Sequence, residues 1–415
     1  MVNEKTGQRE LCYIAKVNNI TPMNADRLEC VHIDGWHCVC GKGEFQVGDI
    51  GVFFEIDSKL PEVEPFTSME FLKSKQYKIK TQKLRGEYSQ GLFVSPSVFG
   101  WETYTDGDGT QYVHANGKSY GVGDFLTEKL GVTYAVKEDN ERKGKTDPIR
   151  SMQDRHKRFF KKPFVKKMMR YKWFRKLMLL FLGRKRNAGE KKFPVGRFPG
   201  VTITDQNRIE NLPWVLEDKT PFIRTMKCDG SSGTYILEKK PFGKYEFYVC
   251  SRRVRMLKPS QECFFGADNY YWEVAKKYDI ENKLKDYLTK NPDISWVCWQ
   301  GEVCAPKIQG NPHGLTETHF FCFHMTDSKN GRFDIREAEK IWKSYDMEVV
   351  PIDKDEYILP DDLEEFKLTA DGLYDSSVCE GKTNQPREGF VYYKTTDPTF
   401  SFKNVSREYL LKHGG

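Results

Sequence analysis

The stretch "RTMKCDGSSGTYIL", from Arg224 to Leu237, decides how this sequence is interpreted. It places Lys227 two residues before Asp229 and Gly230, and a strand-like apolar run follows the two serines. A lysine in this setting is either an ordinary surface residue or a covalent nucleophile. The pattern Lys-x-Asp-Gly is weak alone, since it arises by chance in about one chain in ten of this length. The rest of the chain has to separate the two interpretations.

The length and composition indicate a folded protein with more than one domain. The chain has 415 residues, more than one hydrophobic core usually organises, with 38% hydrophobic and 14% aromatic residues. Its longest apolar run, Leu177 to Leu182, is too short to cross a membrane, and the first twelve residues lack an apolar signal core. Eleven cysteines show no paired zinc-type spacing, so we expect reduced thiols. These features predict an intracellular protein of the cytoplasm or nucleus, neither secreted nor transmembrane.

The positive charge is concentrated in one segment. Residues 150–186 hold fifteen Lys or Arg and a single acid, Asp154, a net charge of +14 against +7 for the whole chain. This segment mixes cations with aromatic residues and predicts one or two helices interrupted near Pro163. Three interpretations fit it: binding to RNA phosphates, contact of residues 164–182 with an anionic membrane, or packing of a solvated helix on a domain. Membrane contact is the least favoured of the three.

Short strands with turns between them fill residues 9–100. Leu28, Cys30 and His32 alternate before Asp34-Gly35, and a second alternating segment follows, which predicts a hairpin. Residues 48–57 and 77–95 add further strands, the second bent near Arg85-Gly86. About five such strands suit a small barrel such as an OB-fold.

Four cations of this region are candidates for binding nucleic acid. Lys78 and Lys80 share one face of their strand, with Lys83 and Arg85 close by. They form either a solvated edge or a barrel surface that faces RNA.

After Phe193 the pattern is a mixture of strands and helices, typical of an α+β domain with mostly antiparallel strands. The segment "FPGVTITDQNRIENL" predicts a loop followed by a helix start, with Thr204 or Asp205 as the cap. Strands are predicted at "SGTYIL", "KYEFYVCS", "ISWVCWQGEV", "THFFCFHMT" and "EGFVYYK", and helices at "DNYYWEVAKKY" and "DIREAEKIWKSY".

Further motifs follow Lys227 in a fixed order. They are "CSRR" (Cys250 to Arg253), "WQGEV" (Trp299 to Val303), "FFCFHM" (Phe320 to Met325), "REGFVYY" (Arg387 to Tyr393) and "FSFKNVS" (Phe400 to Ser406). With the lysine motif, this series resembles motifs I, Ia, III, IIIa, IV and V of covalent nucleotidyltransferases, specifically RNA ligases. The amino-terminal half resembles the OB domain that precedes the catalytic domain in the RNA ligase 5 family. The resemblance covers nearly the whole chain except residues 135–192.

The resemblance implies an α+β multidomain protein. Residues 1–130 would form an RNA-binding OB-type barrel, residues 131–192 a basic helical linker or insert, and residues 193–415 a nucleotidyltransferase domain of the ATP-grasp-like ligase type with antiparallel sheets. Only twelve residues follow Lys403, so we expect no carboxy-terminal barrel. DNA ligases and mRNA capping enzymes usually carry one there, and the barrel-first order therefore favours an RNA ligase.

The chemistry of RNA joining needs a leaving group on the 5′-phosphate, which AMP transferred from ATP supplies. The resemblance implies that Lys227 attacks the α-phosphorus and holds AMP covalently. Lys403 and a metal ion are candidates for lowering the pKa of Lys227 and binding the α-phosphate. Asp229, Glu302 and Glu388 offer carboxylate oxygens to Mg²⁺ or Mn²⁺. Asp229 could instead be a turn residue before Gly230, and the two glutamates could be exposed strand positions.

The remaining site residues follow from the same resemblance. Arg252 would contact a phosphate or the RNA terminus, and Phe323 would stack on adenine with Phe321 behind it as core. Arg208 would bind phosphate or lie exposed on a helix. Met226 replaces the polar residue of many relatives, so the preference for ATP over GTP rests on other groups. The other candidates are Val391 beside the base and Gln309 and Asn311 for RNA or ribose contacts.

The sequence thus predicts a monomeric, ATP-dependent RNA ligase of RNA repair. Relatives of this branch imply sealing of 3′-OH/5′-phosphate nicks in duplex RNA, with RNA/DNA hybrids tolerated. Two alternatives remain: a non-catalytic RNA-binding protein on a ligase scaffold, and a GTP-using capping-type nucleotidyltransferase.

Overall fold

The computed structural model describes residues 9–135, 163–168, 174, 178, 191–192, 194, 196–203, 205–252, 254–256, 270–374, 377–380 and 384–413. Most of the basic segment, including twelve of the nineteen residues of the membrane candidate 164–182, lies outside these residues. Within it, helix α4 (Pro163–Met168) begins at the proline, a residue favoured at the first helical position. No helix in the described ranges is long and apolar enough to cross a membrane.

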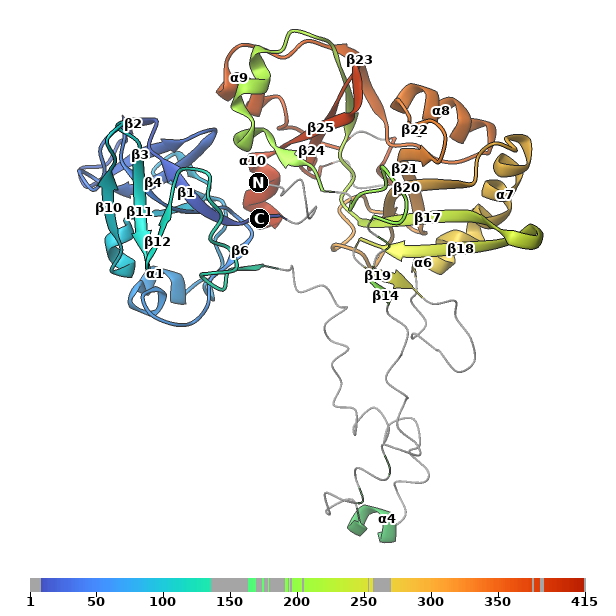
Figure 1. Ribbon diagram of the computed structural model, residues 1–415, viewed down its shortest axis with the longest axis horizontal. Helices are drawn as coiled ribbons and strands as arrows, with labels where there is room; N and C mark the ends of the chain where they lie inside the picture. The colour runs from blue at the N-terminus through green and yellow to red at the C-terminus, as the bar shows by residue number, and fades with distance from the viewer. Residues whose placement is uncertain are drawn as a thin grey trace.

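The amino-terminal domain is a small barrel of short antiparallel strands (Figure 1). The strands form small paired sheets around one core: β1 (Cys12–Lys16), β5 (Ile50–Phe54) and β9 (Leu92–Val94); β2 (Asn19–Pro22), β3 (Leu28–Ile33) and β4 (Trp36–Gly41); β6 (Ser58–Lys59) and β13 (Thr133–Tyr134). A sheet that the sequence did not predict follows them: β10 (Glu102–Thr105), β11 (Gln111–Ala115) and β12 (Lys118–Tyr120). The short helices are η1 (Phe66–Ser68), α1 (Glu70–Lys73) and η2 (Pro96–Phe99).

Two turns of the barrel test the sequence-based predictions. The predicted hairpin at Asp34-Gly35 is confirmed, because Ile33 pairs with Trp36 across the turn. The predicted bent strand near Arg85-Gly86 is wrong, since two strands, β7 (Gln82–Leu84) and β8 (Glu87–Ser89), pair as a hairpin there. Both turn residues have positive φ, 52° and 98°, which reverses the chain.

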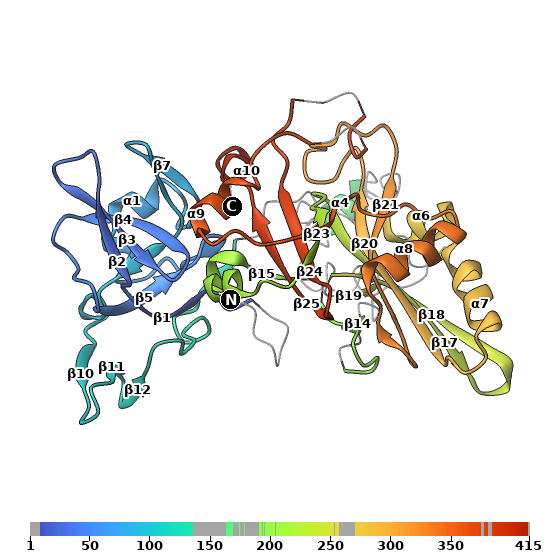
Figure 2. The ribbon, with the colours of Figure 1, turned by 90° about the horizontal axis from the view of Figure 1, so that it is seen from above.

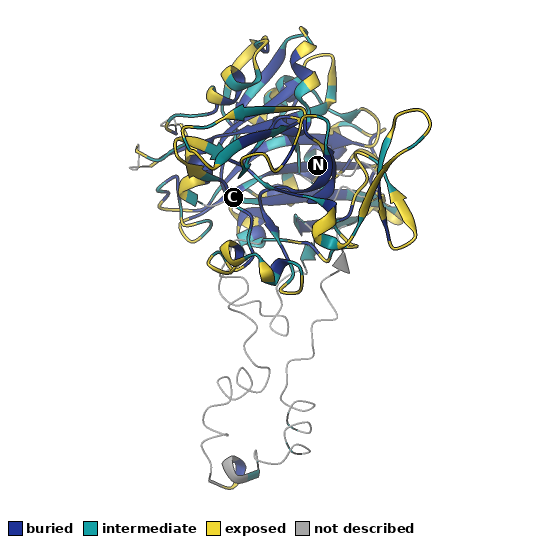
Figure 3. Cartoon of the chain, turned by 90° about the vertical axis from the view of Figure 1, so that its left-hand side faces the viewer, coloured by how far each residue is buried: buried dark blue, intermediate teal, exposed yellow. Residues whose placement is uncertain are grey.

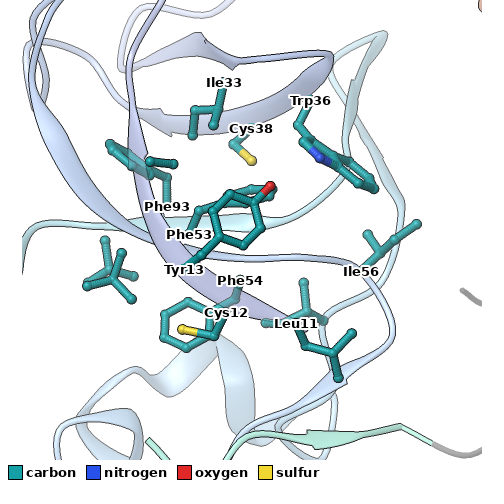
Figure 4. Close-up of a cluster of buried hydrophobic side chains, with 14 of the residues drawn as sticks. Leu11, Cys12, Tyr13, Ile33, Trp36, Cys38, Phe53, Phe54, Ile56 and Phe93 are labelled. Carbon is teal, nitrogen blue, oxygen red and sulfur yellow. The ribbon is translucent and has the colours of Figure 1, made fainter. Parts of the chain in front are cut away.

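Aromatic residues fill the barrel (Figure 4). The rings of Tyr13 and Phe53 meet edge to face with centroids 5.4 Å apart, and Trp36 packs beside Phe53. All five residues of β5 are buried, as the continuous apolar run from Ile50 to Phe54 predicts for a strand covered on both sides.

The carboxy-terminal domain contains two sheets (Figure 2). The larger one has the order β14 (Lys191–Lys192), β19 (Val254–Met256), β18 (Lys244–Ser251), β17 (Ser231–Lys240), β20 (Trp296–Cys304), β21 (His319–Asp327) and β22 (Gly331–Arg332). The smaller one has the order β15 (Asn207–Arg208), β25 (Asp397–Val405), β24 (Gly389–Lys394), β16 (Phe222–Met226) and β23 (Ile352–Tyr357). Only β15 and β25 pair in parallel among these described strands, so the antiparallel prediction is confirmed.

Helices cover the larger sheet on its outer face. Helices α6 (Tyr270–Lys277), α7 (Ile280–Lys290) and α8 (Ile335–Ser344) share one apolar cluster with β17, β20 and β21. Residues between the sheets form a second cluster, so strands at the centre of the domain are buried (Figure 3). The other short helices are η4 (Ile209–Asn211), η5 (Pro213–Glu217), η6 (Pro241–Gly243), α9 (Leu363–Leu368) and α10 (Arg407–His413).

The predicted cap at Asp205 is wrong, although the predicted loop does lead into the short 3-10 helices η4 and η5. Thr204 lies outside the described residues, and Asp205 caps nothing because the short strand β15 and the turn η4 follow it. Asp205 instead pairs with two cations, as described below. Ten of the eleven cysteines lie in the described ranges, and all ten are free thiols.

The barrel is docked directly on the carboxy-terminal domain. The Trp36 indole donates a hydrogen bond of 2.8 Å to the Asn211 side chain, and the Gly35 N–H donates to the carbonyl of Glu210. Tyr409 and Leu410 of α10 belong to the same apolar cluster as the barrel core. The tip of the β3–β4 hairpin and the last helix therefore join the two domains.

Candidate active site

Lys227 lies at the point where the two sheets of the catalytic domain meet. It follows β16 directly, and its N–H donates to the Gly389 carbonyl at the start of β24. Its Nζ lies 2.9 Å from Oε1 of Glu388. Burial lowers the pKa of Lys227, but the attraction of Glu388 and Glu302 outweighs it, and the pKa lies above the usual lysine range. The amine is therefore protonated at neutral pH.

Glu302 approaches the same amine from the other sheet. It lies in β20, where it pairs with Ser232 of β17 and Phe321 of β21. Burial raises the pKa of Glu302 to about 8, Lys227 lowers it, and Glu388 raises it further. A buried carboxyl with this affinity for a proton is equally suited to a cation that replaces the proton.

Asp229 is buried and already has partners. Its carboxylate accepts a hydrogen bond from the Tyr409 hydroxyl, and its N–H donates to His313 Nε2 at 3.1 Å. Burial lowers the pKa of His313 to about 4, so this imidazole is neutral and can accept. Asp229 is 7% exposed, so it is a buried acid with hydrogen-bond partners and not a solvent-exposed residue.

The three predicted metal ligands, Asp229, Glu302 and Glu388, do not lie close enough together to form a metal site by themselves. No group of three or more His, Cys, Asp or Glu in the described ranges is arranged to hold a metal ion unaided. Glu388 Oε2, however, is buried without a hydrogen-bond partner. Carboxylates around Lys227 thus suit a hard cation that takes its other ligands from water or substrate oxygens.

A pocket opens beside Lys227, and side chains of both sheets line it. Phe323 reaches it through a β-bulge: Cys322 pairs with Gly301 and His324 with Gln300, which leaves Phe323 as the extra residue. Such bulges redirect a side chain out of the regular alternation. The full lining is Gln206, Thr225, Met226, Lys227, Cys228, Glu302, Phe323, Val350, Val391 and Tyr393.

The apolar part of this lining contains three sequence-based candidates. Phe323 and Val391 both border the pocket, while Phe321 is buried in the cluster between the sheets. Met226 also lines the pocket, so its thioether occupies the position where the sequence comparison expected a polar group. Gln206 is the uncharged amide side chain in the lining.

Cations gather next to the pocket. Arg208 of β15 and Lys403 of β25 are register partners, which places them side by side. Lys403 Nζ lies 2.8 Å from Asp205 Oδ1, and Arg252 pairs with the other oxygen of Asp205. Burial lowers the pKa of Lys403 to about 8, although Asp205 raises it.

Arg208 is not the exposed helix arginine that the sequence allowed. It is 5% exposed, and its Nη2 lies 3.2 Å from Asp57 of the barrel. Its Nε and Nη1 are buried without hydrogen-bond partners, so two donors remain for an anion.

The candidates for RNA contacts lie farther out. Lys78 and Lys80 are half-buried and alternate with the buried Tyr77, Ile79 and Thr81, as a shared face requires. Lys83 and Arg85 are exposed on the β7–β8 hairpin.

The loop after β20 contains the last two candidates. Gln309 and Asn311 both have positive φ, 50° and 54°. The Asn311 amide accepts from and donates to the backbone of Leu315, so it closes this loop.

Sequence reasoning missed four residues of the site: Asp205, Gln206, His313 and Tyr409. Asp205 and Gln206 belong to the segment 198–212 before Lys227. A charged Asp205 followed by the amide of Gln206 is the signal in the sequence that could have indicated a role in the site. His313 and Tyr409 lie far from Lys227 in sequence, and only the fold brings them to Asp229.

Comparison with known families and structures agrees with this architecture. A family model described as an OB-fold domain matches residues 11–96, and one described as RNA ligase matches residues 220–408. None of the curated proteins compared with the chain matches it.

Solved structures of Naegleria gruberi RNA ligase are similar over nearly the full length. A mutant with ATP and Mn is 27% identical, with a TM-score of 0.68 over 98% of this chain and 99% of that chain. A mutant with AMP and Mn has the same identity, TM-score and coverage. The structure with PPi is also 27% identical and has a TM-score of 0.67 over 98% and 99% of the two chains.

The fold, the order of the domains and these similarities agree on one family. The predicted barrel is an OB-fold, and it precedes the ligase domain in sequence. In this chain an OB-fold domain precedes an RNA ligase domain, as the two family models and the similar RNA ligase structures indicate.

Proposed function

We propose that this RNA ligase seals 3′-OH/5′-phosphate nicks in duplex RNA, in three steps that consume ATP. Lys227 Nζ attacks the α-phosphorus, and the Nζ–P bond forms as pyrophosphate leaves. The RNA 5′-phosphate then takes AMP from the lysine. The RNA 3′-OH attacks that phosphate and releases AMP. The observation that carries the proposal is Lys227, which lies with Glu388 and Glu302 at the edge of the pocket that Phe323 and Val391 line.

The pocket supports a division of roles among its neighbours. Phe323 and Val391 would enclose the adenine, since an aromatic face and an apolar side chain suit a flat base. Arg208, Arg252 and Lys403 would bind the phosphates, and the unpartnered donors of Arg208 favour this role. In-line displacement at phosphorus depends mainly on such positioning and charge neutralisation.

The residues around Lys227 fit a divalent cation, Mg²⁺ or Mn²⁺. The unpartnered Oε2 of Glu388 and the raised pKa of Glu302 support this fit. Glu302 and Glu388 would hold the cation together with water and phosphate oxygens, and Asp229 would hold it or orient the lysine. When bound, it would neutralise charge at the phosphate and favour the unprotonated lysine.

The OB-fold domain and the basic segment would contact RNA. Lys78, Lys80, Lys83 and Arg85 would bind phosphates of the duplex, with Gln309 and Asn311 nearer the break. The division into residues 1–130, 131–192 and 193–415 serves this proposal, with the chain acting as a monomer. An RNA/DNA hybrid across the nick would also be accepted.

An adenylylation assay tests the proposal. Purified protein is incubated with α-labelled ATP or GTP and Mg²⁺ or Mn²⁺, and the label that survives denaturation is located on Lys227 by mass spectrometry. Lys227→Met should lose it, while Lys394→Met, on β24, should keep it. Labelling from GTP alone would favour capping-type chemistry. No labelling with any metal would leave a non-catalytic RNA-binding protein.

A sealing assay then separates the substrates. Wild-type protein should join a 5′-labelled nick in duplex RNA faster than the same ends in single strands. Equal rates would refute nick specificity while leaving RNA ligation intact. A nicked RNA/DNA hybrid reports whether the 3′-OH strand has to be RNA.

A further inference from the structure

We propose that Asp205 is a positioning residue whose carboxylate holds Lys403 and Arg252 in the arrangement that receives the nucleotide phosphates. The inference rests on the proposed function, in which these two cations bind phosphate. It assigns a task to an acid that the lysine motifs do not include.

Each oxygen of Asp205 serves a different cation. Oδ1 accepts from Lys403 of β25 at 2.8 Å, and Oδ2 pairs with Arg252, which follows β18. The side chain of Asp205 is 7% exposed, so water does not substitute for it. Within the described ranges, Asp205 is the only acid that forms an ion pair with either cation. One carboxylate thus bridges the two sheets of the catalytic domain.

Asp205 leaves donors free for a second anion. Arg252 Nε is buried without a hydrogen-bond partner, as are Nε and Nη1 of the neighbouring Arg208. Buried guanidinium donors without partners are uncommon in folded proteins unless a ligand or ordered water completes them. Asp205 therefore fixes the cations without using all of their donors.

The charge around Lys403 makes Asp205 necessary. Asp205 and Asp57 attract the Lys403 ammonium and Arg208, Arg9 and Lys227 repel it, but among the described acids only Asp205 forms an ion pair with it. Burial and these cations lower the pKa of Lys403, while Asp205 raises it. Without Asp205, the ammonium would lose its proton at a lower pH or turn toward solvent.

The backbone holds Asp205 at this position. Asn207 and Arg208 pair in parallel with Phe402 and Lys403, which fixes the distance between the two segments. Gln206, the residue between, lines the nucleotide pocket. The same short segment therefore borders both the base pocket and the phosphate-binding cations.

The experiment measures adenylylation of Lys227 in the full chain as a function of ATP concentration and pH. Asp205→Asn should lower kcat/KM for ATP about 10-fold to 100-fold, the usual effect of removing a group that orients a ligand-binding residue. At alkaline pH, kcat/KM should fall as Lys403 of the free enzyme loses its proton. In Asp205→Asn this fall, the descending pH limb, should occur at lower pH than in the wild type. Asp205→Glu keeps the charge and should retain the wild-type limb with a raised KM.

The matched control is Asp353→Asn. Asp353 forms an ion pair of 2.5 Å with Arg224 on the same smaller sheet, away from Lys403. This control should leave both kcat/KM and the pH limb unchanged, which separates phosphate positioning from the general loss of an ion pair.

Three outcomes would overturn the inference. They are a wild-type kcat/KM in Asp205→Asn, a lowered kcat/KM with an unmoved pH limb, and a shifted limb in Asp205→Glu. If Asp205→Asn does not fold, as judged by near-ultraviolet circular dichroism, Asp205→Glu decides, and a wild-type KM there counts against the inference. Absence of label in the wild type would instead refute the proposed function, so the two failures are distinct.

Discussion

Lys227 Nζ lies 2.9 Å from Glu388 Oε1, and this ion pair keeps the proposed nucleophile protonated. A protonated amine has no lone pair for attack on phosphorus. In the proposed mechanism this arrangement holds Lys227 in place and leaves it inactive until a cation engages the carboxylates. The unpartnered Oε2 of Glu388 is available for that contact.

The first prediction is that alkaline pH does not replace the metal. With EDTA present, adenylylation should be absent at about pH 7.5 and still absent at about pH 9, since the raised pKa of Lys227 exceeds the ordinary lysine value of about 10.4. The sign follows from the charge: acids around an ammonium raise its pKa, so the proton leaves at higher pH. Labelling at both pH values with Mn²⁺ or Mg²⁺ is the control. Metal-free labelling that rises toward pH 9 would contradict it.

The second prediction concerns the base pocket. Phe323→Ala should raise the KM for ATP about 5-fold to 150-fold, because base stacking on an aromatic ring contributes about 1–3 kcal/mol. Phe323→Tyr should stay near wild type, since it keeps the aromatic face. The measurement is Lys227 labelling against ATP concentration.

Phe321→Ala is the comparison for that series. Phe321 is buried between the sheets, and its removal should cost about 3–5 kcal/mol of folding free energy, measured by chemical denaturation. At a temperature where the variant is folded, its KM for ATP should stay near wild type. A larger KM change for Phe321→Ala than for Phe323→Ala would reverse the two assignments.

The catalytic half of the fold was predictable because its signals are local. Apolar strand runs such as Trp296 to Cys304 and the ordered motifs after Lys227 need no tertiary information to be recognised. The Asp34-Gly35 hairpin belongs to the same class, since a turn is specified by the residues within it.

The bend predicted at Arg85-Gly86 failed at a local turn, whereas other failures depend on contacts between distant segments. Asp205 has the composition of a helix cap, and only the approach of β25 shows that it pairs with Lys403 instead. Tyr409 reaches Asp229 across 180 residues, a distance over which one sequence carries no pairing signal.

The third prediction concerns the junction between the domains. A Cβ added at Gly35 would lie 2.5 Å from the Glu210 Cα, a backbone atom that cannot move aside alone. Gly35→Ala should therefore cost about 1–3 kcal/mol and loosen the docking, which limited proteolysis would detect as faster cleavage between the domains. Gly107→Ala is the control, because its Cβ meets nothing within 4 Å. Equal protease resistance in both variants would contradict the close contact.

The fourth prediction concerns the hydrogen bond between Tyr409 and Asp229. Tyr409→Phe removes one donor from a buried carboxylate and should lower the free energy of unfolding by about 1.5–3 kcal/mol, together with the rate of nick sealing. Tyr345→Phe removes a similar bond of 2.8 Å to Asp286 at the surface and should have a smaller effect. The pair is compared by denaturant titration, and an unchanged midpoint for Tyr409→Phe would remove its structural role.

The fifth prediction concerns the path of the RNA over the OB-fold domain. Lys78 and Lys80 are half-buried and alternate with buried residues, and we expect their ammonium groups to share one surface. If each lysine binds one phosphate, Lys78→Ala and Lys80→Ala should weaken nicked-duplex binding. Each should also reduce the slope of log K against log salt by about one.

The control is Lys343→Ala, which removes an equally flexible charge on α8, on the outer face of the larger sheet. It should leave the slope unchanged. Adenylylation of Lys227 without RNA should be normal in the single variants, the double variant of Lys78 and Lys80, and the control. None of these side chains lies at the nucleotide pocket. A slope equal to that of the wild type in the double variant would contradict RNA binding at Lys78 and Lys80. The basic segment would then be the better candidate for contacting the RNA.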